Sequence, residues 1–168
     1  VPYIHAAGEF KTKPTQHSVK QLQEAGIQPD ILVLRTEQAL QKDILAKVAQ
    51  FCNVAPDAVI QSIDMPTIYE IPLLLRDQKM DEAVLRKVGI EPGPRPEMKA
   101  WCAFVEKLKS AHEEVSIALV GKYVELQDAY KSIDESLLQS CTYNDKKLRL
   151  TSIQSEHITE ENVAELLS

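Results

Sequence analysis

The sequence has few cysteines and glycines, and no long apolar run. Its three cysteines, Cys52, Cys102 and Cys141, lie far apart without a Cys-x-x-Cys pair, so neither a disulfide framework nor a zinc site is expected. No apolar stretch approaches the roughly 20 residues that span a bilayer, and residues 1–4 do not resemble a signal peptide. A glycine-rich phosphate loop and histidines at metal-ligand spacing are also missing. We therefore expect no metal site, no membrane span and a reducing, cytoplasmic setting.

The composition is that of a soluble globular chain. The 168 residues are 44% hydrophobic and 26% charged, which is enough for one domain or two small ones. The formal net charge of -6 argues against a general binder of nucleic acid or of anionic membranes. A local group of basic residues in such an acidic chain indicates a defined small anion as its ligand.

The segment from Gly8 to Lys20 contains such a group, with two lysines, two threonines and a glutamine around a proline. Because a proline disfavours the α conformation of the residue before it, we expect residues 11–13 to be extended, with Lys11 and Lys13 on the same side. Pro14 suits the first position of a helix, and Gly26 suits its end. The exposed N–H groups of this helix start would then lie beside two ammonium groups. The pattern predicts an anion site, and a solvated polar helix start remains the alternative.

The first half of the sequence alternates between strand and helix patterns. We expect strands at residues 1–4, 30–35 and 58–63, and a helix at 43–51 with Lys47 at the border of its apolar stripe. The continuous apolar run at 30–35 is typical of a parallel strand covered on both faces. This order predicts an α/β domain with a mostly parallel sheet.

The corner after the strand at 58–63 is a second candidate contact point. Ligands of open α/β sheets bind at the carboxyl ends of the strands, where Ile63, Asp64 and Met65 would lie. On the pattern alone, an ordinary strand-to-helix turn is the better explanation. A helix begins near Pro66, must kink or break at Pro72, and continues an apolar face to Gly89.

Residues 89–97 hold three prolines and two glycines, which predicts an extended linker. A helix is expected at 97–111, with Trp101 as a packing anchor rather than a ligand contact. The pattern then restarts with a buried strand at 115–121, a helix at 128–140, a strand at 148–153 and a helix start at 159–162. This is about one strand–helix–strand–helix unit.

Several motifs, in order and across nearly the whole chain, resemble the CTP synthase family. The most specific is Lys-Thr-Lys-Pro-Thr-Gln at 11–16, and the others are Gly8-Glu9-Phe10, Phe51-Cys52-Asn53-Val54, Ile68-Tyr69-Glu70-Ile71-Pro72 and Val120-Gly121-Lys122-Tyr123 with the residues to Ser132. The resemblance implies a P-loop amidoligase domain of the dethiobiotin-synthetase type and a class I glutamine amidotransferase domain. Such an enzyme uses ATP and Mg²⁺ to activate UTP, and ammonia from glutamine then gives CTP.

The resemblance also implies the site residues and partners. Contacts to UTP and to the feedback inhibitor CTP fall on Lys11, Thr12, Lys13, Pro14, Thr15, Gln16 and Lys47, and the adenine of ATP lies near Ile63, Asp64 and Met65. A homotetramer would place the lysine segment between subunits. GTP can act as an activator near residues 122–131, with no residue assigned. No nucleic-acid or membrane partner is implied.

The family's P-loop, Mg²⁺ ligands and amidotransferase catalytic residues have no counterpart in the sequence, so no catalytic or metal-binding residue is assigned. We expect an internal segment of the enzyme: the end of the amidoligase domain at 1–89, a linker and helix at 90–114, and the first β-α-β-α unit of the amidotransferase domain at 115–168. Alone it is expected to be inactive. The alternatives are a non-catalytic module that binds nucleotide or oligomerises, and a scaffold that links two domains.

Overall fold

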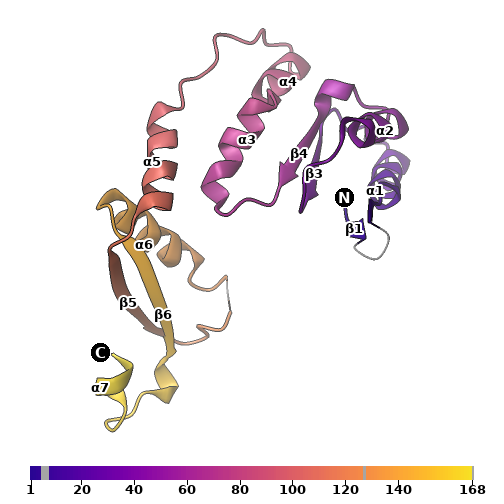
Figure 1. The fold of residues 1–168 in the computed structure, drawn as a ribbon. Coiled ribbons are helices and arrows are strands. Elements are labelled where there is room, and N and C mark those ends of the chain that lie inside the picture. The colour runs from indigo at the N-terminus through magenta and orange to yellow at the C-terminus, as the bar shows by residue number, and fades with distance from the viewer. Residues whose placement is uncertain (5–7, 127, 168) are drawn as a thin grey trace. The chain divides into compact units, whose positions relative to one another are not determined.

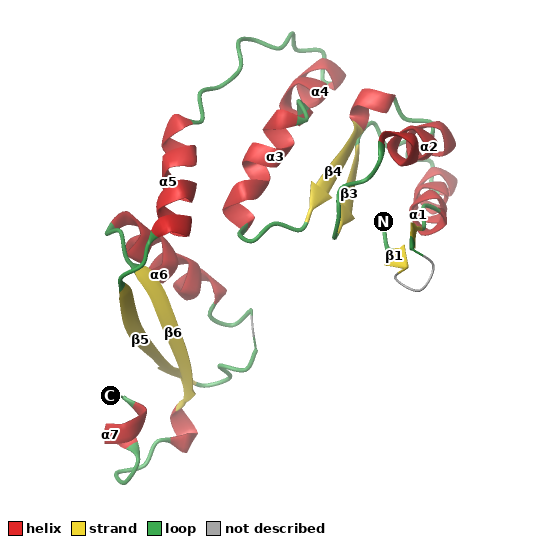
Figure 2. Ribbon diagram, viewed as in Figure 1, coloured by secondary structure: helices red, strands yellow, loops and turns green. Residues whose placement is uncertain are grey.

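The computed structural model describes residues 1–4, 8–126 and 128–167 (Figure 1). His5 and Gln127, the latter within the predicted Val120–Ser132 motif, lie outside the described residues. The chain divides into two compact units, Val1–Glu97 and Met98–Ser168, and this division falls inside the segment predicted as linker and helix. Figure 2 distinguishes the helices and strands of each unit, which are described separately below.

The first unit begins with a small hairpin. Strand β1 (Tyr3–Ile4) pairs antiparallel with β2 (Glu9–Phe10), and the rings of Tyr3 and Phe10 meet edge to face with their centroids 4.9 Å apart. The sequence predicted the strand but not its antiparallel partner. The hairpin sets the direction in which the lysine segment leaves β2.

A helix-connected pair of parallel strands forms the centre of this unit. Helix α1 (Lys13–Glu24) leads to β3 (Leu32–Thr36), and α2 (Lys42–Cys52) and the short turn η1 (Pro56–Ala58) connect β3 to β4 (Val59–Ile63). The strands pair in parallel, with Leu32 opposite Val59 and Thr36 opposite Ile63. The predicted α/β character and parallel pairing are therefore confirmed. The expected cover on both faces is wrong for β3, because Val33 is 48% exposed.

The hydrophobic core of the unit lies between these elements. Val48 and Cys52 on α2 are fully buried in it, and Leu34 on β3 is 4% exposed. Asn53 ends α2 in the left-handed conformation, which Asn tolerates better than most residues. Gly26 ends α1 in the same conformation, and the bonds from Gly26 N to Gln23 O and from Ile27 N to Leu22 O form a Schellman motif, as the predicted stop requires.

The segment after β4 folds as three short helical pieces. A single turn, η2 (Ile68–Glu70), precedes α3 (Ile71–Asp77) and α4 (Met80–Lys87). Pro72 lies in the first turn of α3, so the predicted break falls between η2 and α3, and the proline is at the start of the second piece. Lys79, in the left-handed conformation, separates α3 from α4. Residues 88–98 then form neither helix nor strand.

A glutamine side chain from the turn between α3 and α4 bonds to the outer edge of β4. The amide of Gln78 accepts the backbone N–H of Gln61 at 2.9 Å and donates to the carbonyl of Gln61 at 2.7 Å. It also donates to the carbonyl of Leu74 at 3.1 Å. The Gln78 side chain thus takes the place that a neighbouring strand would occupy at the middle of β4.

The second unit repeats the strand–helix–strand order. After α5 (Lys99–Ser110), strand β5 (Glu114–Gly121) pairs in parallel with β6 (Lys147–Gln154) along its whole length, and α6 (Lys131–Tyr143) connects them. The turn η3 (Ser155–His157) and the short helix α7 (Val163–Leu166) follow.

Two expectations about this unit are wrong. Helix α6 begins at Lys131 rather than at residue 128, because Tyr130 is its non-helical N-cap and donates its hydroxyl to the carbonyl of Lys122 at 2.9 Å. Strand β5 is not buried throughout. Its residues alternate between half-buried and exposed, and Val120 is 44% exposed, which is typical of a strand with one covered face.

Among the residues that the structure describes, no helix combines the length and apolar character needed to cross a membrane.

Candidate anion-binding site

The lysine segment, residues 11–16, follows the β1–β2 hairpin and enters helix α1 directly. The backbone N–H of Lys11 donates to the carbonyl of Pro2 at 3.0 Å, which extends the pairing of β1 and β2 by one bond. Thr12 already has helical dihedral angles (φ -86°, ψ -18°), and Lys13 is the first residue of α1. The predicted extended run over 11–13 is therefore wrong beyond Lys11, and strand alternation does not place Lys11 and Lys13 on the same side.

Thr12 explains why the helix begins before the proline. Its side chain is buried, with 6% of the residue exposed, and its hydroxyl accepts a hydrogen bond from Gln16 Nε2 at 3.1 Å. Its carbonyl accepts the backbone N–H of Gln16 at 3.1 Å. Both bonds join residues one helical turn apart. They stabilise the helical conformation at Lys13 against the extended conformation that Pro14 favours there.

The start of α1 has the features of an anion site. The Thr12 side chain does not cap the helix, and the first turn contains no acidic residue. The first N–H groups of a helix have no intrahelical partner, and the macrodipole makes this end electropositive. Lys13 and Pro14 are exposed here, and Thr15 and Gln16 are half-buried. An anion at this position would meet backbone N–H groups and a lysine together.

Helix α2 brings Lys47 to the same region. Helices α1 and α2 pack against each other, and Lys47 is exposed beside the buried Val48. The Lys11 ammonium forms an ion pair with the Glu9 carboxylate. A hydrogen bond from Lys11, its positive charge and the more distant charge of Lys47 together lower the pKa of Glu9. The Glu9 carboxylate, which pairs with Lys11, therefore also feels the positive charge of Lys47.

Glu9 is a residue of this site for which the sequence predicted no role. The signal was present, because Glu9 and Lys11 are two residues apart at the end of a strand, and alternating side chains of an extended segment share a side. The side-chain alternation of an extended strand, predicted for Lys11 and Lys13, is found one pair earlier. It holds for Glu9 and Lys11, whose backbone is extended, and not for Lys11 and Lys13.

The second predicted contact point lies at the carboxyl ends of β3 and β4. Asp64 follows β4 directly, donates its N–H to the Thr36 carbonyl at 2.9 Å, and accepts from Arg35 Nε at 3.2 Å. A pocket of about 250 Å³ beside it is lined by Val1, Pro2, Arg35, Thr36, Glu37 and Asp64. Asp64 is thus part of a concave surface, while Ile63 and Met65 are half-buried and do not line it.

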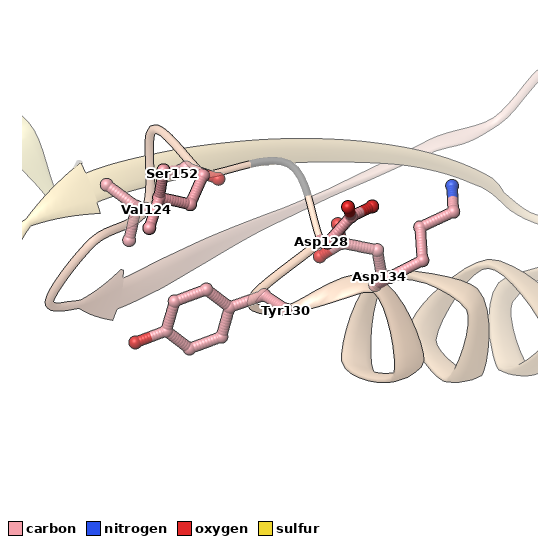
Figure 3. A pocket seen from close by; sticks show the side chains of 7 residues that line it. Val124, Asp128, Tyr130, Asp134 and Ser152 are labelled. Carbon is pink, nitrogen blue, oxygen red and sulfur yellow. The ribbon is translucent and has the colours of Figure 1, made fainter.

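The second unit has a pocket of about 340 Å³ in its predicted family motif. It lies between the loop after β5, the start of α6 and β6, and Figure 3 shows Val124, Asp128, Tyr130, Asp134 and Ser152 around it. Leu126 and Lys131 complete the lining. Lys131 also forms an ion pair with Glu135 at 2.9 Å, and the hydrogen bond and charge of that partner raise the pKa of Lys131.

Within residues 1–4, 8–126 and 128–167, no three His, Cys, Asp or Glu side chains gather in a group that could hold a metal ion. No residue of this described part is therefore assigned to a metal ion.

The fold and the helix start define the class as an α/β protein with a candidate anion-binding site, and comparisons with known proteins make the class specific. The family described as CTP synthase N-terminus matches residues 1–90, more than half of the chain. A CTP synthase from Porphyromonas gingivalis is 72% identical over 167 residues. CTP synthases from Bacteroides fragilis and Streptococcus pneumoniae are 58% and 50% identical over 167 and 168 residues.

The chain belongs to the CTP synthase family. Each of these alignments covers 99% or 100% of the chain and 31% of the relative, so the chain spans about a third of the length of the curated relatives that it matches.

Proposed function

We propose that this chain is part of a ligase that makes CTP from UTP by ATP-dependent amination, with ammonia released from glutamine, in pyrimidine nucleotide synthesis. Within that enzyme the chain supplies residues that bind UTP and the feedback inhibitor CTP. The observation that carries the proposal is the start of α1. This helix start has a lysine, backbone N–H groups without a side-chain cap, and no acidic residue in its first turn. This electropositive arrangement complements the negative charge of a nucleoside triphosphate.

The proposed roles of these residues differ with their burial and their place on the helix. Lys13, at the exposed helix start, and Lys47, on α2, supply charge for the phosphates, as Lys11 does. Thr12 is buried, so its side chain positions Gln16 rather than touching a ligand. Pro14 fixes the backbone of the first helical turn, and Thr15 and Gln16 present polar groups beside it.

The other partners of the family enter at separate places. The pocket at the carboxyl ends of β3 and β4, with Asp64 on its wall and Ile63 and Met65 beside it, is the proposed neighbourhood of the ATP adenine. Mg²⁺ would accompany ATP, with its ligands outside the described residues. GTP is proposed as an activator, and glutamine as the ammonia source of the amidotransferase part.

The domain assignment follows the same proposal. The first unit corresponds to the end of a P-loop amidoligase domain, and β5, α6, β6 and α7 correspond to the start of a class I amidotransferase domain. The enzyme is proposed to act as a homotetramer in the cytoplasm.

Lys13→Ala in the full-length protein tests the ligand assignment. Each charge-assisted contact to a phosphate is worth roughly 1.5–3 kcal/mol, so we expect UTP and CTP to bind about tenfold to a hundredfold more weakly by calorimetry. Lys20→Ala is the matched control, because Lys20 is exposed on the same helix about 10 Å further along its axis. Unchanged affinity in the Lys13 variant would remove the nucleotide assignment from this helix start.

An assay of CTP formation from UTP, ATP and glutamine separates the proposal from its alternative, a non-catalytic module that binds nucleotide or oligomerises. The 168-residue chain is expected to form no CTP, and the full-length protein is expected to form it. If the full-length protein bound UTP with dependence on Lys13 but made no CTP, the module would be the better description.

A further inference from the structure

A carboxylate is part of the proposed phosphate site. Glu9, the first residue of β2, pairs with Lys11, which follows the strand. Their side chains are 54% and 47% exposed, so a ligand from solvent can reach the pair. Neither partner is held in a dry core, and the pair can open without leaving a buried charge.

Both Lys11 and Lys47 act on this carboxylate. The hydrogen bond and charge of Lys11 are the main cause of the lowered pKa of Glu9, while partial desolvation opposes them and Lys47 adds a smaller favourable charge. A triphosphate that used these two lysines would therefore compete with the negative charge of the Glu9 carboxylate, which already pairs with Lys11.

We propose that Glu9 is an internal competitor of the anionic ligand: its carboxylate pairs with Lys11 in the unliganded protein, and a bound phosphate displaces it. The proposal rests on the proposed function, because it takes Lys11 as a phosphate contact. With Lys11, Lys13 and Lys47, Glu9 reduces the net charge of the site from +3 to +2. Its effect is to weaken binding and to raise the ligand concentration at which the site fills.

The alternative is that Glu9 supports ligand binding. If Glu9 instead held Lys11 in its binding position, removing the carboxylate would leave the lysine disordered and weaken the ligand. The two roles predict opposite signs for the same substitution, so a single binding measurement distinguishes them.

The test is Glu9→Gln in the full-length protein, titrated by calorimetry with UTP and, separately, with inorganic tripolyphosphate. Exposed ion pairs are weak, so we expect about a twofold to fivefold tightening of both ligands. The gain should vanish in a Lys11→Gln background, because the competitor then has no cation to occupy. Weaker or unchanged binding in Glu9→Gln would overturn the proposal, as would an equal gain in the Lys11→Gln background.

Glu24→Gln is the matched control. Glu24 is an exposed acid at the other end of α1, about 16 Å along the axis from Lys13 and beyond the screening length of physiological salt, so its loss should leave both affinities unchanged. The two ligands separate the failures. If Glu9→Gln bound tripolyphosphate more tightly but did not bind UTP, this result would contradict the nucleotide assignment and leave the role of Glu9 standing. Loss of binding of both ligands to the wild-type protein contradicts both proposals.

Discussion

The two units build the same motif, a helix-connected pair of parallel strands, and bury it to different depths. In the first unit α2 and α3 both pack against β4, one on each side in Figure 1, and Ile60 is 2% exposed. In the second unit α6 packs against β6, and the residues of β5 alternate between half-buried and exposed. Strand β4, which has a helix on each side, is therefore buried more deeply than β5, which has one covered face.

The largest expected effect is a difference between two core truncations. Ile60→Ala should destabilise the first unit by about 2–5 kcal/mol, because a fully buried side chain leaves a cavity. Leu150→Ala, at a half-buried position of β6, should cost less than half as much, since part of its surface is already in water. Hydrogen exchange of the β4 and β6 amides in urea reads each unit separately. Equal losses of stability in the two variants would show that Leu150 contributes as much to packing as the buried Ile60.

A medium effect is expected at the end of β5. A Cβ on Gly121 would lie 2.7 Å from Cζ of Tyr130 and closer still to its hydroxyl, so Gly121→Ala must displace the ring and should cost about 1–3 kcal/mol. Gly93→Ala is the control, because no atom lies within 4 Å of the added carbon.

Urea unfolding of both glycine variants measures the difference between them. Tyr130→Ala should remove most of the added penalty of Gly121→Ala, and a penalty that persisted in the double variant would locate the strain elsewhere.

The smallest effect should come from the surface ion pairs of the second unit. Lys147 lies 2.9 Å from Glu114, and their side chains are 57% and 45% exposed. Lys147→Ala is expected to leave the urea midpoint of β6 within error, because exposed pairs contribute little. A clear shift would mean that charges, rather than apolar packing, stabilise this unit.

The pH dependence of this pair has a defined sign. The hydrogen bond and charge of Lys147 lower the pKa of Glu114 below its usual 4.5. The contribution of the pair is therefore present above that value and is lost as the pH falls through the lowered pKa. Unfolding measured between about pH 5 and pH 7 should show no change that depends on Lys147.

The elements of the fold were predictable from local patterns, and the site was predictable in part. Apolar runs gave the parallel strands, and Gly26 gave the end of α1, because these signals lie within a few residues. The prediction of an extended conformation up to the start of α1 was wrong, because the hydrogen bonds between Gln16 and Thr12 outweighed the conformational preference imposed by Pro14. The pairing of Glu9 with Lys11 needed the backbone conformation at each position, which depends on the β1–β2 hairpin.

The Gln78 amide at the edge of β4 has a consequence for association between molecules. An exposed edge strand offers unpaired peptide groups to any other extended chain, and proteins often protect such edges with charges or prolines. Here a carboxamide satisfies both peptide groups of Gln61, so an incoming strand would have to remove it first. Gln78 therefore blocks the middle of this edge of β4 against pairing with another strand.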